Sequence, residues 1–104
     1  MQKAQSIFNE VIQSSFEKFS RYNIPFPTIQ IRQMKKRWGS CTPTGKIILN
    51  PELIKAPKAC IEYVIIHELC HLVHPNHNIA FLNLQEKIMP EWKKWKARLE
   101  YCLA

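Results

Sequence analysis

The sequence predicts an α+β fold, with helices before and after a small antiparallel sheet. Apolar residues recur at helical spacing near the N-terminus and again after residue 57, whereas residues 28–34 alternate between apolar and polar side chains. The chain has 104 residues, and one domain usually takes ~100–200 residues. We therefore expect residues 1–104 to form a single domain around one hydrophobic core.

The first helix is expected over residues 5–20, where polar residues separate a stripe of apolar ones. Pro25 and Pro27 then exclude a helix, because proline lacks an amide hydrogen and restricts the residue before it. The apolar stripe consists of Ile7, Phe8, Val11, Ile12, Phe16 and Phe19.

The middle of the chain is expected to form the sheet. Residues 28–34 have the alternation of a half-buried strand. Residues 37–42 and 46–50 flank Pro43-Thr44-Gly45, which predicts a β-hairpin. Asn50 precedes Pro51 and is expected to cap a turn or helix that begins there.

Three helices are expected in the second half. Residues 57–73 lack an interior Gly or Pro and are apolar on most sides, so this helix should lie in the core. A second helix is expected from residue 77 to about 89 with Asn76 as its cap, and a third after Pro90. The last helix carries a stripe of Trp92, Trp95, Leu99 and Cys102.

The chain is basic, with 15 Lys and Arg against 8 Asp and Glu and a formal net charge of +7. This excess favours anionic partners such as nucleic acid, although solvated lysines explain it equally well. Lys35, Lys36 and Arg37 precede Trp38, but no RNA- or DNA-binding motif is present. The apolar stripe of the last helix favours core packing for its tryptophans over base stacking.

Several features predict a cytoplasmic protein without a membrane partner. No apolar run approaches the ~18 residues of a membrane helix, and the polar N-terminus predicts no signal peptide. The cysteines are widely spaced and form no C-x-x-C pair, which favours reduced thiols over a disulfide framework. They are Cys41, Cys60, Cys70 and Cys102.

The residues that indicate chemistry are His67, Glu68 and His71, which form an H-E-x-x-H motif. On a helix, positions i and i+4 share one face, so both imidazoles can reach one metal ion. Glu68 lies about 100° away around the same turn, where a carboxylate can reach a water molecule without binding the metal. The motif therefore predicts a zinc site with Glu68 as general base.

A third ligand is expected from outside this helix, because catalytic zinc usually has three protein ligands. His77 is favoured, since H-E-x-x-H-x-x-x-x-x-H is the ligand spacing of metzincins, although this chain has His74 where they have a turn-forming Gly. Glu86 or Glu91 would serve in an arrangement similar to that of gluzincins. His74 is a further alternative, less suited because it lies on the same helix.

Several segments together resemble the YgjP-like metallopeptidase family, in a short form. They are Arg37-Trp38-Gly39-Ser40-Cys41, Ile48-Leu49-Asn50, residues 61–72, and Asn76-His77 with Phe81. The family is similar to the SprT-like and WLM metallopeptidases, whose H-x-x-x-F element fits His77 to Phe81. The resemblance implies a minimal zincin-like domain, a small sheet packed on an active-site helix, with His77 as third zinc ligand. A helix replaces the family's usual extra β-rich segment, and this shorter sheet favours a shallow cleft. Asn78 and Leu82 also replace the family's usual Ser and Trp.

Other residues have roles that the sequence leaves open. Trp38, Gly39 and Ser40 are expected on the strand beside the helix, where they either bind an extended peptide substrate or form a bulge with Trp38 in the core. His74, Tyr63 and Tyr101 are candidates for stabilising an oxyanion. Cys41 and Cys70 either coordinate zinc in a latent form or are buried inert thiols.

The sequence thus predicts a zinc-dependent metallopeptidase with one Zn²⁺ per chain, held by His67, His71 and His77. One alternative is a metal-dependent nucleoside triphosphate phosphohydrolase, with phosphates held by Lys35, Lys36 and Arg37. Another is a non-catalytic module that binds zinc and nucleic acid. The identity of the substrate, the oligomeric state, and whether the isolated chain is active or latent stay open.

Overall fold

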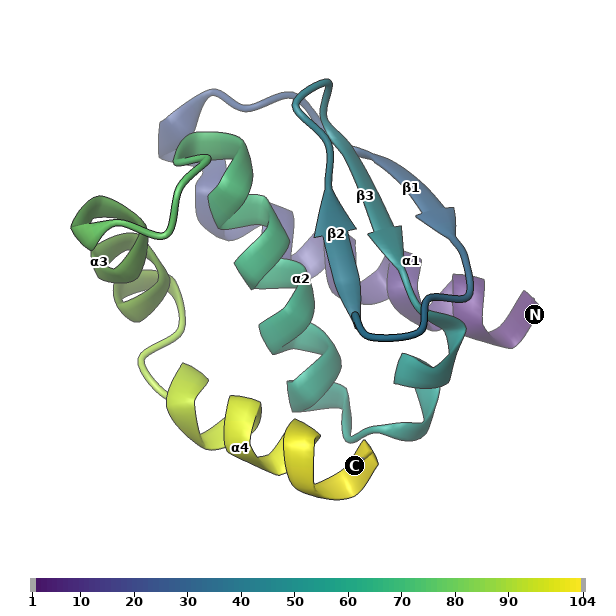
Figure 1. Ribbon diagram of the computed structural model, residues 1–104. Helices are drawn as coiled ribbons and strands as arrows, with labels where there is room; N and C mark the ends of the chain where they lie inside the picture. Colours follow the sequence, from purple (N-terminus) through teal and green to yellow (C-terminus); the bar gives the residue numbers. More distant parts are fainter. Residues whose placement is uncertain (1, 104) are drawn as a thin grey trace.

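The computed structural model describes the backbone of residues 2–103 and the side chains of residues 5–101. Within this range, a three-stranded sheet lies at one side of a group of helices, which confirms the predicted α+β class (Figure 1). The elements are α1 (Gln2–Phe16), the 3-10 helix η1 (Glu17–Tyr22), β1 (Thr28–Ile31), β2 (Gly39–Cys41), β3 (Lys46–Leu49), the 3-10 helix η2 (Pro51–Lys55), α2 (Lys58–Val73), α3 (Ile79–Ile88) and α4 (Trp92–Leu103). Cys102 of the predicted C-terminal stripe lies outside the described side chains.

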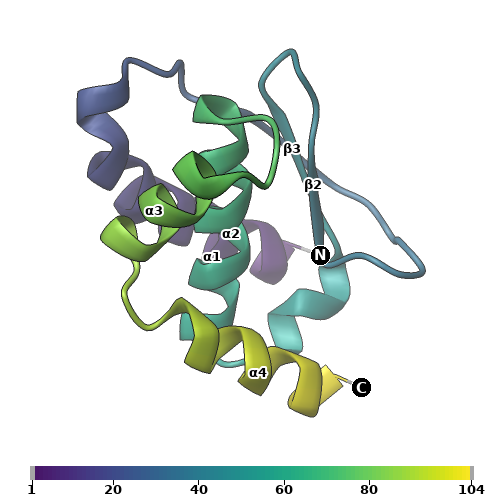
Figure 2. The same cartoon turned by 60° about the vertical axis from the view of Figure 1, so that its left-hand side comes forward.

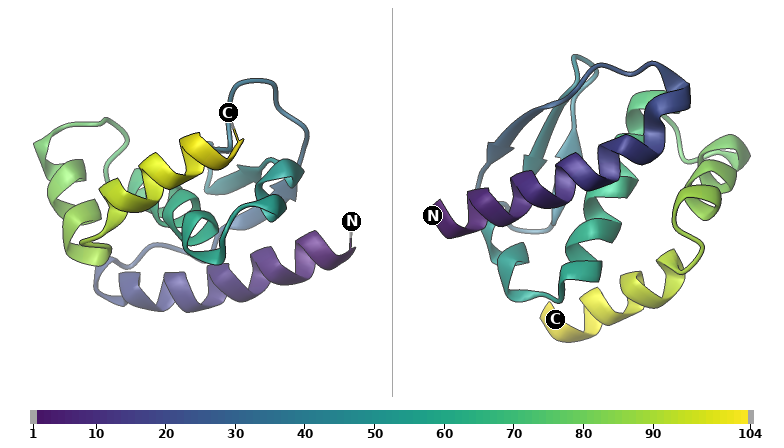
Figure 3. Two further views of the ribbon diagram at one scale, coloured as in Figure 1. Left: turned by 90° about the horizontal axis from the view of Figure 1, so that it is seen from below. Right: turned by 180° about the vertical axis from the view of Figure 1, so that it is seen from behind.

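Helix α2 lies at the centre of the molecule, as its apolar composition predicts. Figures 1 and 2 show it between the sheet and the two C-terminal helices. The right panel of Figure 3, seen from behind, shows α1 crossing in front of α2 and the sheet. Ile65, Ile66 and Leu69 are completely buried in this arrangement. Although α2 is apolar, it has only 16 residues, and no helix within residues 2–103 has the length and hydropathy to cross a membrane.

The sheet is mixed, which corrects the prediction of a purely antiparallel one. Strand β3 is central in the order β1-β3-β2 and pairs antiparallel with β2, as the predicted hairpin requires. It pairs parallel with β1, with Thr28 opposite Lys46 and Ile31 opposite Leu49. Alternating side chains predict which face a strand buries, but they carry no information on its neighbour or direction. Strand β2 is therefore an edge strand of the sheet, and it lies against α2.

The turn of the β2–β3 hairpin lies where the sequence predicts it. Thr42 donates its N–H to the carbonyl of Lys46 at 2.9 Å, and Gly45 donates its N–H to the carbonyl of Thr42 at 3.1 Å. Gly45 has a φ of +90°, a backbone conformation that favours glycine. This residue therefore closes the hairpin and sets the register of β2 on β3.

Asn50 connects the sheet to the segment that follows it, as predicted for a cap before Pro51. Its Oδ1 accepts the N–H of Glu52 at 3.0 Å. Its Nδ2 donates to the carbonyl oxygens of Met34 at 2.8 Å and Arg37 at 3.1 Å. One buried amide thus caps η2 and holds the loop that leads into β2.

Helix α3 begins at Ile79, two residues later than predicted, and its cap is Asn78 instead of Asn76. The Oδ1 of Asn78 accepts the N–H of Phe81 at 3.0 Å, whereas Asn76 is exposed. A helix starting at residue 77 would have contained His77. The later start leaves this residue in the connecting loop, where its ring can turn towards α2.

Candidate metal centre

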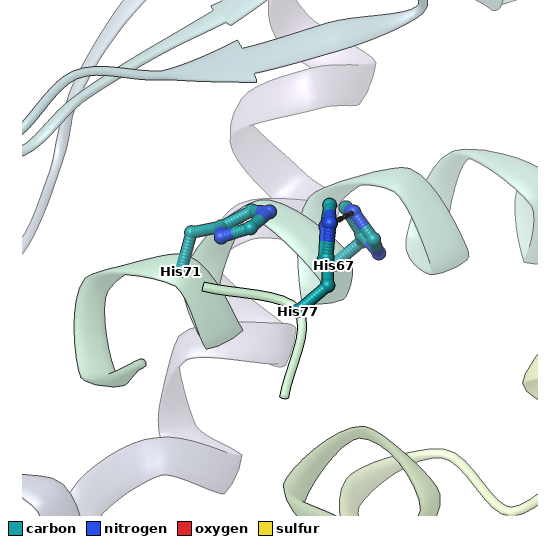
Figure 4. A group of neighbouring side chains, drawn as sticks. All are labelled: His67, His71 and His77. Carbon is teal, nitrogen blue, oxygen red and sulfur yellow. Dashed lines mark hydrogen bonds between the residues drawn. The ribbon is translucent and has the colours of Figure 1, made fainter. Parts of the chain in front are cut away.

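Three histidine side chains converge where α2 meets the loop that leads into α3. His67 and His71 lie one turn apart on α2, and His77 comes from the loop (Figure 4). One nitrogen from each ring lies within 4.8 Å of the other two. Nε2 of His67 and Nε2 of His77 lie 3.2 Å apart. Among the described residues, these three form a group of side chains that could hold a metal ion.

The rival ligands from the sequence lie outside this group. Glu86 is an exposed residue of α3 and accepts a hydrogen bond from Nε1 of Trp92 at 2.9 Å, which explains its position without a metal. Neither Glu91 nor His74 belongs to the group. The structure therefore favours His77 among the four residues weighed as third ligand.

The hydrogen bonds of the two α2 histidines determine which ring nitrogen each presents. His67 Nδ1 lies 2.8 Å from Oε1 of Gln85, and His71 Nδ1 lies 3.1 Å from the carbonyl oxygen of Pro75. Both partners are acceptors, so each Nδ1 carries a hydrogen and donates it. Each neutral ring therefore keeps its lone pair on Nε2, the atom that remains to bind a metal.

Burial keeps these two rings neutral. The pKa of His67 is lowered to about 4, mainly by burial and also by the nearby His71, His77 and Lys96, against the opposing effect of the Gln85 bond. Burial also lowers the pKa of His71, with a contribution from His77. Neutral imidazole is the form that binds metals, so both rings are in a form that could bind a metal ion at neutral pH.

Phe81 forms the base of the histidine group. Its buried ring lies 5.0 Å from the ring of His67, 4.6 Å from that of His71 and 4.8 Å from that of His77, measured between centroids. Two of these contacts are edge-on, an arrangement that aromatic rings prefer. One apolar side chain of α3 therefore restricts the position of all three imidazoles.

Glu68 follows His67 on α2 and is 6 % exposed. Its burial raises the pKa of the carboxyl group to about 7, although the nearby Arg37 acts in the opposite direction. The carboxylate lines the same pocket as the three histidines. A carboxyl group with a pKa near 7 can accept and release a proton at neutral pH, as a general base requires.

Gly39 lies directly against α2, and this contact explains why the position lacks a side chain. A Cβ atom there would lie 2.8 Å from Cγ1 of Val64 and 3.3 Å from both Cγ and Oε2 of Glu68. The glycine therefore lets β2 approach the helix that carries Glu68. The close approach that Gly39 allows is thus towards the protein's own helix.

A pocket of about 700 Å³ opens between β2, α2 and the last helix. This volume lies within the ~300–1,000 Å³ of small-molecule sites. Its lining includes the predicted strand residues Trp38, Gly39 and Ser40 beside the three histidines. Trp38 is half-buried and packs against the core, so the strand residues and the histidines form one surface.

Of the three candidates for stabilising an oxyanion, only Tyr63 lines this pocket. Its ring lies 5.9 Å from the ring of His67 and stacks on Trp92 at 6.4 Å. Burial raises the pKa of Tyr63 to about 12, so its hydroxyl keeps its hydrogen. Tyr101 is 85 % exposed and His74 lies outside the pocket lining.

The cysteines predicted as alternative zinc ligands do not belong to the histidine group. Cys41 lines the pocket, where burial and Glu68 raise the pKa of its thiol to about 11. Cys70 is buried within α2, and the same two causes raise its pKa to about 12. Both residues carry protonated thiols at neutral pH, whereas thiolates are the metal-binding form.

The tryptophans of α4 pack against the core, as the apolar stripe predicts. Trp92 and Trp95 are half-buried against it. The ammonium groups of Lys93 and Lys94 lie over their rings, at 5.7 Å from the centroid of Trp92 and 4.8 Å from that of Trp95. These rings are engaged within the protein, which disfavours their use as a platform for nucleic-acid bases.

The sequence-based reasoning missed Gln85, a side chain of α3 that is 1 % exposed and contacts His67 directly. Its only signal in the sequence is the spacing His77, Phe81, Gln85, which places the three residues at intervals of four. This spacing can be interpreted only when it is known where α3 begins and how it packs on α2. The residue became recognisable only from the packing of α3 on α2.

A central helix carrying H-E-x-x-H, a sheet edge beside it and a third histidine from the next segment define the class of zincin-like metallopeptidases. Solved structures support this class. The metallopeptidase zymogen of Pyrococcus abyssi abylysin is similar at 25 % identity, covering 92 % of this chain and 94 % of that chain, with a TM-score of 0.82. The zymogen of Methanocaldococcus jannaschii jannalysin is similar at 24 % identity, covering 97 % and 90 %, with a TM-score of 0.72.

The family follows from the sequence match. The family model of the YgjP-like metallopeptidase domain matches residues 1–101, so the chain belongs to the YgjP-like metallopeptidase family. This confirms the resemblance noted from the motifs. A comparison with curated proteins gives no match.

Proposed function

We propose that this protein is a zinc-dependent peptidase that cleaves peptide bonds, with one zinc ion per chain. His67, His71 and His77 are the metal ligands and Glu68 is the general base. The observation that carries the proposal is the convergence of three ring nitrogens within 4.8 Å beside a buried carboxylate in the same pocket. Membership of a metallopeptidase family supports the same reaction class.

The donor set suits zinc. Imidazole nitrogens are common zinc ligands, and three protein ligands leave a position for water. His67 and His71 are neutral and present Nε2, so neither has to lose a proton or reorient its ring before it binds. A bound zinc ion supplies a Lewis acid and lowers the pKa of a coordinated water from 15.7 towards ~7.

Glu68 moves the proton in this proposal. Its carboxylate accepts a proton from the attacking water and then donates it to the amine of the leaving group. A pKa near 7 suits both steps, because the carboxyl group must be ionised before the first and protonated before the second. Such acid–base assistance typically contributes ~10²–10⁴ in rate.

We infer that the peptide substrate lies along β2 at Gly39 and Ser40 and reaches Trp38, the residue just before the strand. β2 is an edge strand in the described sheet, and an extended peptide can add to such an edge through backbone hydrogen bonds. All three residues line the pocket that contains the histidines. Gly39 serves this arrangement indirectly, because it allows the strand to lie close to Glu68.

Two further proposals concern the whole chain. Residues 1–104 act as one domain, since α2 contacts α1, β2, α3 and α4. The protein works in the cytoplasm, a location supported by the free thiols of Cys41 and Cys70.

The test measures bound metal and then turnover of a peptide library by the wild type, Glu68→Gln and His77→Ala. We expect about one zinc per wild-type chain, zinc retained but peptide cleavage lost in Glu68→Gln, and zinc weakened in His77→Ala. Because both solved neighbours are zymogens, metal binding and turnover are scored separately. A wild type without zinc, or a Glu68→Gln variant with full activity, contradicts the proposal.

Nucleoside triphosphates are included in the same assay, because the alternative phosphohydrolase predicts their turnover. Of the three cations expected to hold phosphates, Arg37 lines the pocket, whereas Lys35 and Lys36 are exposed and do not. The family match and this lining both favour a peptide substrate.

A further inference from the structure

Helix α3 supports the histidine group with residues spaced four apart. His77 precedes the helix, and Phe81 and Gln85 follow at intervals of four on the helix face that packs towards α2. Gln85 is one of the largest fully buried side chains in the described structure. A buried amide without a hydrogen bond is destabilising, so the position of Gln85 calls for a specific partner.

That partner is the ring of His67. The Oε1 of Gln85 lies 2.8 Å from Nδ1, and because a carbonyl oxygen only accepts, the hydrogen is on Nδ1. The opposite tautomer would place a hydrogen on Nε2, the nitrogen that lies 3.2 Å from Nε2 of His77. The bond therefore decides whether His67 presents a lone pair or a hydrogen to the centre of the histidine group.

We propose that Gln85 is the positioning residue of His67: it sets the tautomer and the ring orientation that make Nε2 a ligand. The inference rests on the proposed metal site. His71 has a different arrangement, since its Nδ1 donates to a backbone carbonyl that no substitution of a side chain removes. Gln85 is thus the point at which a side-chain substitution can change the tautomer of a ligand.

The neutral amide also has a chemical consequence. A carboxylate in this position would draw the Nδ1 hydrogen and make the imidazole more basic, whereas an amide leaves the ring a neutral ligand. Partners of this kind typically change metal affinity 10–100-fold when they are removed. Gln85→Glu keeps an acceptor at the same distance from the backbone, so it is the conservative variant.

The experiment compares the wild type with Gln85→Leu, Gln85→Glu and Leu84→Ala. Leu84 is buried on the same helix and outside the histidine group, so it controls for lost stability. The readouts are the His67 tautomer from ¹⁵N NMR of the metal-free protein, the Zn²⁺ affinity from competition with a chelator, and the thermal midpoint.

We expect the wild type to show the Nδ1–H tautomer at His67 and Gln85→Leu to lose this preference together with about 10–100-fold in Zn²⁺ affinity. Gln85→Glu should keep the tautomer and bind Zn²⁺ at least as tightly as the wild type. Leu84→Ala should lower the thermal midpoint and change neither the tautomer nor the affinity.

Three outcomes overturn the inference. They are an Nε2–H tautomer in the wild type, wild-type Zn²⁺ affinity in Gln85→Leu, and an equal loss of affinity in Leu84→Ala. The first needs no variant, so the inference stays testable if Gln85→Leu does not fold. A wild type that binds no Zn²⁺ but shows the Nδ1–H tautomer contradicts the proposed function and leaves the positioning of His67 by Gln85 supported.

Discussion

The histidine group has a packed side and an open side. On the packed side, Glu68, Phe81 and Gln85 are buried, and the last two hold the ring of His67 from α3. On the open side, His77 is exposed, and His71 donates to the carbonyl of an exposed proline in the loop between α2 and α3. The difference indicates that Phe81 contacts all three rings, but among the described contacts only His67 is also held by a buried side-chain hydrogen bond, whereas His71 and His77 depend in addition on a short solvent-facing loop.

We expect the largest effect when Phe81, the side chain beneath the histidine group, is truncated. Phe81→Ala leaves a cavity beneath three imidazoles, and we expect it to lower the free energy of unfolding by about 3–5 kcal/mol. Urea unfolding measures this loss. The matched control is Leu82→Ala, whose side chain is 41 % exposed and should cost about 0.5 kcal/mol or less. Equal losses in the two variants would show that the packed side is no more tightly built than the surface.

The second prediction concerns the buried carboxylate of Glu68 in protein freed of metal. Because its pKa is raised, Glu68 stays protonated in the folded state between about pH 4.5 and 7, whereas it is ionised in the unfolded state. The contribution of Glu68 to the free energy of unfolding therefore falls as the pH rises through that window. Glu68→Gln should therefore be more stable than the wild type at pH 8, by up to about 3 kcal/mol, and equal to it near pH 4.5.

The pKa of His67 acts in the opposite sense, because it is lowered to about 4 and its stability contribution is lost as the pH falls from about 6.5. The two trends offset each other in the wild type between about pH 4.5 and 6.5. Because burial also lowers the pKa of His71, urea unfolding at several pH values should show a loss of stability on acidification that is shallower for the wild type than for Glu68→Gln. The exposed Glu91→Gln is the control, and a similar gain at pH 8 in this variant would contradict the assignment.

The third prediction compares the two glycines. Gly39→Ala places a methyl group against Val64 and Glu68, and we expect a loss of about 1–3 kcal/mol with a change in the pH dependence of peptide cleavage. Gly45→Ala has open space around the new Cβ but a φ of +90°, so it should cost about 1 kcal/mol through the backbone and leave the pH dependence unchanged. If both variants changed the pH dependence, the contact of Gly39 with Glu68 would not be the cause, and the prediction would be wrong.

The smallest expected effect is on the open side, at the start of α3. Asn78→Ala removes the cap that accepts the N–H of Phe81, and it should cost about 1 kcal/mol and weaken zinc binding through the adjacent His77. Asn76→Ala, at the position that the sequence alone suggested as the cap, should be nearly neutral. Thermal unfolding measures the stability of the two variants, and chelator competition measures their zinc affinity. A larger loss in Asn76→Ala than in Asn78→Ala would show that Asn76 is the cap.

The fold could be predicted in its elements but not in its connections. The spacing of apolar residues identified the helices, and the Asn50-Pro51 and Pro43-Thr44-Gly45 segments identified a cap and a turn, because these signals act within a few residues. The parallel pairing of β1 with β3 was missed, since strand direction depends on where residues 32–38 carry the chain. The start of α3 was misplaced by two residues because two nearby asparagines were equally suitable caps.

By itself, the sequence determined the chemistry of the site: two histidines and a glutamate at helical spacing, and a further histidine at a set distance along the chain. Residues one turn apart on a helix share a face whatever surrounds them, so this information is local. Only the tertiary structure decided that Gln85 orients His67, that Phe81 lies beneath three imidazoles, and that Gly39 brings β2 against Glu68. These contacts join side chains from separate elements, and they exist only after burial of the apolar faces has brought α3 and the sheet against α2.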